Sequence, residues 1–287
     1  MTDNYYSDAI KGAVWMLAAS ICYVSSATLT RYLAGSYPTF ELTFLRCLIG
    51  VVVLTPLVLR GDLNQLKTKN FSLHCLRAVI TYIAILLWFY ATEKVPVGDF
   101  FAIQFVSPLF TIAVAAILLR EKVSAKSWLA ALVGFAGVMV VIRPGYIPIS
   151  LGIIAALGTA AAYAFVNTCI KVLSRNDSPT VMTFYVNVLV LVLAAIPAYL
   201  TWKMPIAADW PVLIGVALFA TMAQFCVASS ISLADARVVQ PMNFLRMPIA
   251  AGMGFMVFGE FPDLWTWVGA VIIFSAAWYA VQQGKKR

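Results

Sequence analysis

Long, continuously apolar runs constrain the fold of this chain more than any other feature. A helix that crosses a bilayer needs roughly 20 apolar residues, and ten runs of about that length fill the sequence, near 12–33, 40–59, 73–91, 99–119, 127–142, 150–174, 178–201, 210–232, 238–259 and 264–282. Of the 287 residues, 62% are hydrophobic and 11% charged, whereas soluble domains are about 45–50% apolar and about 25% charged. The runs lack the alternation of β-barrel strands. We therefore predict an all-α integral membrane protein with ten transmembrane helices and no additional soluble domain.

The twenty Lys and Arg residues predict the orientation of the helices. Fourteen of them fall in the two termini and in the connections on one side of the predicted membrane, with Arg77 counted among them. Four lie on the opposite side, and Arg46 and Arg246 lie inside spans. The positive-inside rule therefore places both termini in the cytoplasm. We interpret the first run as a retained helix, because it lacks a small-residue cleavage site.

The basic balance of the chain, +8, does not predict binding to nucleic acid, because the cations are scattered over short connections and form no phosphate-binding face. The five cysteines stand singly, without the spacing of a zinc, redox or disulfide site. We therefore expect no metal and no cofactor.

Two halves of the sequence resemble each other at an offset of about 140 residues. The matched pairs are Gly12 with Gly152, Tyr23 with Tyr163, Arg31 with Lys171, and Pro108 with Pro248. Five helices in each half force the second half to enter the membrane in the opposite sense, so residues 1–145 and 146–287 form an inverted repeat within one transport unit. In transporters, this arrangement puts the binding site near the bilayer midplane between the halves.

The segments that carry the repeat also resemble a known family. Pro108 to Glu121, followed by Trp128 and Gly134-Phe-Ala-Gly137, and Pro248 to Glu260, followed by Trp267 and Gly269-Ala270, are similar to the EamA repeat of the drug/metabolite transporter superfamily. The resemblance covers the chain twice. Within that superfamily the chain looks most like bacterial ten-helix exporters of amino acids, including aromatic ones. The resemblance implies a carrier in the bacterial inner membrane with a cavity bordered by helices 1, 3, 4, 6, 8 and 9.

Two charged residues lie deep in predicted spans, where an unpaired charge is costly. Arg246 lies about 12 Å into its helix at 1.5 Å per residue. It binds either a substrate carboxylate or the backbone carbonyls freed by Pro241 and Pro248. Arg46 is more simply explained by reaching the outer interface or Glu41. Since no Asp or Glu falls near the middle of a span and His74 begins a helix, facilitated diffusion is favoured over proton-driven transport.

Polar and aromatic side chains on the predicted cavity helices form the candidate substrate site, which comprises Tyr23, Tyr82, Trp88, Gln104, Tyr163, Asn167, Gln224, Asn243, Arg246 and Met247. The alternative for each of them is hydrogen bonding or packing between helices. Pro108 and Pro248 are candidate hinges, because a proline inside a helix removes a backbone hydrogen bond. Gly134, Gly137 and Ala270 favour close helix packing, with a dimer face as the alternative.

We therefore predict a secondary transporter that exports small metabolites, amino acids first among them, by alternating access. It acts as a monomer or weak homodimer on an amino acid or related metabolite. Drugs or nucleotide-type metabolites are alternative substrates. A membrane partner subunit that transports nothing is an alternative role. An enzyme is disfavoured, because the spans carry no zinc-spaced His/Glu set, no carboxylate pair and no Gly-x-Ser-x-Gly elbow.

Overall fold

The computed structural model describes residues 2–60, 66–107, 110, 114, 125–143, 150–233 and 245–283, and within these ranges it contains helices and no strands. The α-helices are α1 (Thr2–Tyr32), α2 (Thr39–Arg60), α3 (Phe71–Lys94), α4 (Val97–Gln104), α6 (Ala125–Ile142), α7 (Leu151–Leu173), α8 (Pro179–Leu200), α9 (Trp210–Leu233), α11 (Arg246–Phe258) and α12 (Leu264–Gln283). A short 3-10 helix, Ala207–Asp209, precedes α9.

Each α-helix falls on one of the apolar runs expected from the sequence. Among the described residues, six helices are long and apolar enough to cross a membrane, namely those in 10–32, 39–60, 71–94, 151–173, 179–200 and 207–233. The shorter apolar stretches at 132–142, 246–258 and 264–276 belong to α6, α11 and α12. The chain is therefore a multi-pass membrane protein. Since α4 and α11 cover only parts of their runs, the number ten remains a prediction.

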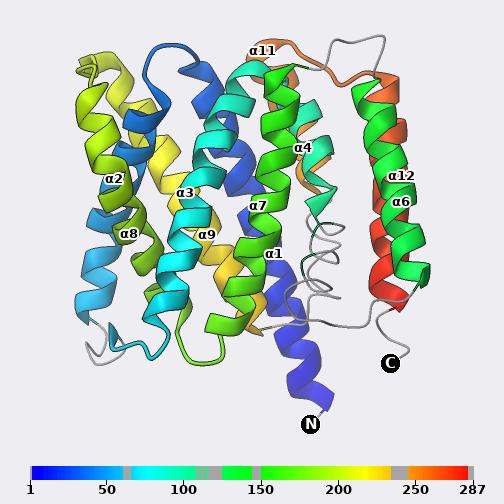
Figure 1. Cartoon of the computed structure of the whole chain (residues 1–287), viewed down its shortest axis with the longest axis horizontal. Coiled ribbons are helices and arrows are strands. Elements are labelled where there is room, and N and C mark those ends of the chain that lie inside the picture. The colour runs from blue at the N-terminus through cyan, green and yellow to red at the C-terminus, as the bar shows by residue number, and fades with distance from the viewer. Residues whose placement is uncertain are drawn as a thin grey trace.

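The helices form one elongated bundle (Figure 1). The pair α2 and α8 lies at one side, the pair α6 and α12 at the opposite side, and α1, α3, α7 and α9 lie between them. The helix α1 begins and α12 ends at the lower end of the bundle in Figure 1. We call this the N-terminal end and the other the far end.

Helix contacts are exchanged between the two halves in a regular way. Helix α1 packs on α9, and α3 packs on α7. The repeat matches α1, α2 and α3 with α7, α8 and α9. Under this matching, the contact of α1 with α9 corresponds to the contact of α7 with α3. The pairs α2 with α8, α4 with α11 and α6 with α12 each join matched partners. This packing pattern is the one expected of two repeats related by a two-fold axis.

The two glycines aligned by the repeat, Gly12 and Gly152, occupy matching places. The Ser230 hydroxyl near the end of α9 donates to the Gly12 carbonyl in the first half of α1, at 2.7 Å. Gly152 at the start of α7 lies against Lys94 and Val95 at the end of α3, and a Cβ there would come within 2.8 Å of the Lys94 Cβ. In both halves, the first helix thus meets the end of the other half's third helix at a glycine.

Helices α6 and α12 approach closely through glycines. A Cβ at Gly269 would lie 2.7 Å from the Gly137 carbonyl oxygen and 3.1 Å from the Val141 backbone nitrogen. Ala270 is buried beside Gly269. Small residues allow such backbone contact in membranes, so Gly137 and Ala270 serve helix packing.

Local sequence signals explain where several helices begin and end. Ser150 and Ser178 cap α7 and α8 by accepting hydrogen bonds from the backbone nitrogens of Ile153 and Val181. Gly259 ends α11 with φ of 69°, a left-handed conformation that glycine adopts without steric cost.

The outward faces of the bundle carry large apolar side chains. On α2 and α8 these include Val52, Leu57, Val192 and Ile196, which are between 54% and 72% exposed. Exposed apolar surface on this scale is unfavourable in water and favourable against lipid. The exposed side chains therefore form a lipid-facing surface.

Candidate functional site

A small cavity lies between α1, α3, α7 and α9, and it reaches from near the middle of these helices to the parts of α3 and α7 that are nearer the N-terminal end. Tyr23, Tyr163, Asn167 and Gln224 line it, as the sequence analysis expected for a substrate site. Val166, Ile170 and Val227 supply an apolar wall, and Arg77 and Thr81 complete the lining. The free volume is about 10 Å³, which is room for about one water molecule. A larger solute can therefore bind only when these helices separate.

An aromatic cluster lies at the cavity, where Tyr23 and Tyr163 belong to the lining and Trp88 packs against them outside it. The ring of Tyr23 lies 5.5 Å from that of Trp88 and 6.3 Å from that of Tyr163, and Trp88 and Tyr163 are 6.1 Å apart, measured between centroids. Behind them Phe100 contacts Trp88 edge-on at 4.7 Å. The geometry suits stacking with a further ring, because aromatic pairs favour centroid distances of about 4.5–7 Å.

Polar atoms at the cavity are buried without a hydrogen-bond partner. They are the Gln224 Oε1, the Thr81 Oγ1 and the Arg77 Nε atoms, and each of these residues is at most 6% exposed. Leaving a buried polar group unpaired costs about 1–3 kcal/mol, so such groups call for an explanation. A ligand with its own donors and acceptors would satisfy them.

Arg246 lies beside the cavity, at the start of α11. Its guanidinium carbon lies 4.7 Å from the centre of the Tyr23 ring, a cation–π contact. Its Nε donates to the Ser20 hydroxyl at 3.4 Å, and Ser20 donates in turn to the Met16 carbonyl at 2.9 Å. These contacts hold the cation next to the aromatic cluster.

Arg77 corrects the sequence analysis, which counted it with the cytoplasmic connections. It lies inside α3, is 1% exposed, lines the cavity and donates from Nη1 to the Met182 carbonyl at 2.9 Å. The signal was present, since residue 77 falls within the apolar run 73–91.

Arg46 does not make the expected contacts. It is 5% exposed, so it does not reach the interface, and the structure records no ion pair between it and Glu41. Glu41 instead accepts from the Lys203 backbone nitrogen at 2.9 Å. The charge of Arg46 acts on the hydroxyls of Tyr23 and Tyr163, but its side chain is not among those that line the cavity.

The remaining candidates do not line the cavity. Gln104 is buried and donates from Nε2 to the Ala156 carbonyl at 3.0 Å, which joins α4 to α7. Tyr82 is half-buried, Met247 is buried in the core and Pro248 is exposed. As the third residue of α11, Pro248 removes no hydrogen bond within that helix. Pro108 and Asn243 lie outside the described residues.

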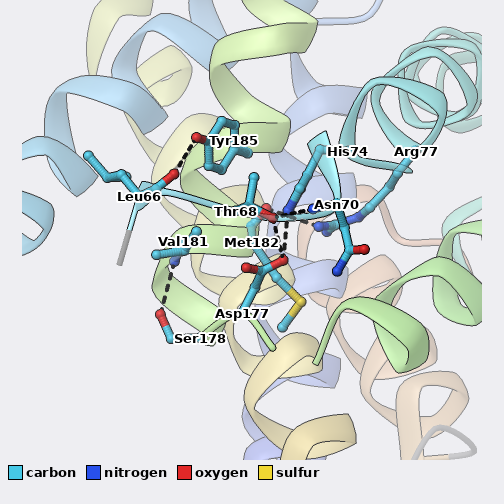
Figure 2. A network of polar contacts seen from close by, with 10 residues as sticks. All are labelled: Leu66, Thr68, Asn70, His74, Arg77, Asp177, Ser178, Val181, Met182 and Tyr185. Carbon is cyan, nitrogen blue, oxygen red and sulfur yellow. Dashed lines mark hydrogen bonds and ion pairs between the residues drawn. The ribbon is translucent and has the colours of Figure 1, made fainter. Parts of the chain in front are cut away.

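A polar network closes the N-terminal end of the bundle (Figure 2). The His74 Nε2 lies 3.1 Å from the Asp177 Oδ2, and Thr68 donates to the same oxygen at 3.0 Å. The Tyr185 hydroxyl donates to the Leu66 carbonyl at 2.6 Å. Arg77 lies one helical turn beyond His74, so the network reaches from this end to the cavity.

Ion pairs tie the halves together at the far end. Arg31 at the end of α1 binds Glu260 beyond α11 at 2.5 Å. Arg143 after α6 binds Asp263 before α12. Partial burial opposes ionisation of Asp263, but hydrogen bonds from Thr266 and the charge of Arg143 outweigh it and hold the pKa of this carboxyl below its ordinary value.

Metal chemistry finds no support in the described part of the chain. No group of three His, Cys, Asp or Glu residues there could hold a metal ion, and the five cysteines are unpaired. The cavity thus offers aromatic faces, hydrogen-bonding groups and cations, which suit solute binding.

Comparison with known sequences supports a transport role for this geometry. Residues 10–143 and 150–282 each match the profile of the EamA-like transporter family. A solved crystal structure shares 18% sequence identity with the chain, covers 98% of both chains and gives a TM-score of 0.65. At that identity the likeness shows the fold alone.

Relatives that match over nearly the whole chain are transporters of several solutes. A riboflavin transporter of Vibrio cholerae is 31% identical and covers 97% of this chain and 95% of its own. An S-adenosylmethionine uptake transporter of Rickettsia prowazekii is 27% identical, with coverage of 98% and 97%. A pseudopaline exporter of Pseudomonas aeruginosa is 25% identical, with coverage of 97% and 99%.

Proposed function

The chain belongs to the EamA-like transporter family, and from this premise we propose that it carries a small planar aromatic solute across the bacterial inner membrane, with riboflavin as the first candidate. The observation that carries this proposal is the cluster of Tyr23, Trp88 and Tyr163 beside two buried oxygens without a hydrogen-bond partner, Gln224 Oε1 and Thr81 Oγ1. A flavin ring presents two flat faces and an edge with one N–H between two carbonyls. The faces suit the cluster, and the edge suits an acceptor beside donors.

The relatives support the same candidate. Two riboflavin transporters, of Vibrio cholerae and of Brucella anthropi (30% identical), match 97% and 93% of the chain. The other relatives carry S-adenosylmethionine and pseudopaline, so family membership alone leaves the solute open. The aromatic cluster at the cavity supports the flavin among these.

Export of an aromatic amino acid is the second candidate. It is favoured by Arg246, whose guanidinium group lies on the Tyr23 ring and would bind a carboxylate while the aromatic cluster holds the side chain. Gln224 and Asn167 would then accept hydrogen bonds from the ammonium group.

We further propose ten spans in two inverted repeats that rock against each other, with both termini cytoplasmic and Pro108 as a bending point. The exchanged helix contacts support the inverted repeat. His74–Asp177 at one end and Arg31–Glu260 and Arg143–Asp263 at the other each join residues of the two predicted halves. Breaking one set while the other holds would open the cavity to one side at a time.

Facilitated diffusion remains our proposal for energetics. The ionisable groups at the cavity are Tyr23, Tyr163 and Arg77. Arginine stays protonated in proteins, so Arg77 cannot serve as a proton carrier. Movement down the solute gradient needs no such carrier.

Counterflow in proteoliposomes tests the function. Vesicles that contain the purified full-length protein are preloaded with unlabelled riboflavin or tyrosine, and the entry of the same labelled solute is followed. Riboflavin entry above that of protein-free vesicles supports the first candidate, and tyrosine entry supports the second. Entry of neither solute would contradict both.

A further inference from the structure

Three guanidinium groups from three different helices lie at or near the candidate site. Arg46 comes from α2, Arg77 from α3 and Arg246 from α11. Arg77 lines the cavity, and the guanidinium carbon of Arg246 lies 4.7 Å from the centre of the Tyr23 ring. The charge of Arg46 acts on the hydroxyls of Tyr23 and Tyr163 from nearby. The residues are far apart in the sequence, so the fold alone brings the positive charges together.

Arg46 and Arg77 are buried and Arg246 is half-buried, and all three have neutral or missing hydrogen-bond partners. Arg46 and Arg77 are 5% and 1% exposed, and the Nε of each has no hydrogen-bond partner. Arg77 donates one hydrogen bond to the Met182 carbonyl, and Arg246 donates one from Nε to the Ser20 hydroxyl. Their polar partners are therefore neutral.

No carboxylate among the lining residues compensates the charge. Glu41, the buried carboxylate on α2, binds the Lys203 backbone, and Asp177 binds His74 and Thr68. Like charges at this depth repel each other, and a buried charge is costly unless a counter-charge accompanies it. A neutral solute would leave all three cations uncompensated.

We propose that the site prefers an anionic solute to a neutral one with the same ring, such as flavin mononucleotide to riboflavin, with the carboxylate or phosphate group held among Arg46, Arg77 and Arg246. This inference rests on the proposed transport function and specifies its substrate class. The aromatic cluster then holds a ring, and the arginines hold the acidic group attached to it. Transport of such a solute carries net negative charge, so an inside-negative potential drives it outward.

Two matched pairs of solutes test the inference in proteoliposomes. Riboflavin and flavin mononucleotide share a ring system and differ by a phosphate. Phenylalanine and phenylpyruvate share a side chain and differ in net charge. We expect faster counterflow of the anionic member within whichever pair is carried. Faster counterflow of flavin mononucleotide than of riboflavin would identify the acidic group as a phosphate. Faster counterflow of phenylpyruvate than of phenylalanine would identify it as a carboxylate.

Membrane potential gives a second readout that does not depend on mutation. The potential is set with potassium gradients and valinomycin, and entry of the anionic solute is measured at each value. At equilibrium a potential of about 100 mV shifts the distribution of a monovalent anion about fiftyfold. We expect entry of the anionic solute to accelerate when the interior is positive, while entry of a neutral solute stays constant.

Variants then locate the anion. Arg46→Gln and Arg77→Gln should each weaken binding of the anionic solute about tenfold or more, since one charge-assisted hydrogen bond is lost. Arg46→Lys should retain more affinity than Arg46→Gln, because it keeps the charge. The matched control is Arg60→Gln, an exposed arginine on the same helix as Arg46, which should leave binding unchanged.

The outcomes separate this inference from the function on which it rests. Transport of riboflavin or phenylalanine with no preference for the anionic partner, or with no response to potential, would overturn the inference and leave the function standing. Transport of neither pair would overturn both. If the Gln variants do not fold, the anion preference and the potential response of the unmodified protein decide the matter.

Discussion

The His74 imidazole and the Asp177 carboxylate lie 3.1 Å apart although 103 residues separate them in the sequence. His74 belongs to α3 and Asp177 follows α7, so the contact ties the two predicted halves at the N-terminal end (Figure 2). Both side chains are at most 4% exposed. The pair is therefore a strong candidate for a contact that breaks when this end opens.

Removing the carboxylate should loosen the N-terminal end. Cys169 belongs to α7, lies near Arg77 of α3 and is 8% exposed. In Asp177→Ala we expect Cys169 to react faster with a maleimide, because α3 and α7 separate more often. Mass spectrometry of the labelled peptide measures the rate. Asn176→Ala alters an exposed neighbour and serves as control. Equal labelling in all three proteins would contradict a latch.

The far end should resist acid. The pKa of Asp263 is lowered, as described above, so its stabilising contribution is complete above the ordinary value near 3.9 and is lost as the pH falls through the lowered one. We expect the melting temperatures of the wild type and Asp263→Asn to differ by a constant amount between about pH 7 and 5. The difference should shrink only below about pH 4. A difference that vanishes near neutral pH would contradict the ion pair.

The glycine contact between α6 and α12 should tolerate no side chain. Gly269→Ala should destabilise the protein by about 1–3 kcal/mol, because the added Cβ meets backbone atoms of α6. Gly252→Ala on α11 meets nothing within 4 Å and should be neutral or stabilising by up to about 1 kcal/mol. Thermal unfolding in detergent measures both. Equal effects would contradict the packing.

Removing an aromatic ring from the cluster should weaken the binding of the solute. In Trp88→Leu the solute loses ring contacts worth about 0.5–1.5 kcal/mol each, so we expect riboflavin to bind about threefold to tenfold more weakly. Trp265→Leu changes a tryptophan that is 52% exposed near the start of α12 and should bind normally. Isothermal titration compares them. Unaltered binding to Trp88→Leu would exclude the cluster from the site.

The sequence predicted much of the fold because apolar run lengths are set by the bilayer. The repeat was equally readable, since Gly12 and Gly152 both lie where the first helix of one half meets the third helix of the other. Tyr23, Tyr163, Asn167 and Gln224 were found because polar groups within an apolar span stand out.

Other features depend on three-dimensional detail. Arg77 was missed because counting cations by position treats a residue near a helix end as exposed, whatever the helix packs against. Arg46 is buried because it lies on the face of α2 that packs against other helices. The sequence does not indicate which face that is, because a helix in lipid is apolar on its outer and inner faces alike. Gln104 joins α4 to α7 by donating a hydrogen bond to the backbone carbonyl of Ala156. The sequence cannot indicate this partner, because every residue has a backbone carbonyl.

Equilibrium binding of riboflavin to the purified protein tests the central claim, that the cavity between α1, α3, α7 and α9 holds the solute. Binding is followed through quenching of flavin fluorescence by the neighbouring aromatic rings. We predict quenching by the wild type and a loss of affinity of about fivefold or more in Gln224→Leu, which removes a buried acceptor. The exposed-site variant Arg60→Gln should match the wild type. Equal affinity in Gln224→Leu and the wild type would place the solute elsewhere and contradict the assignment.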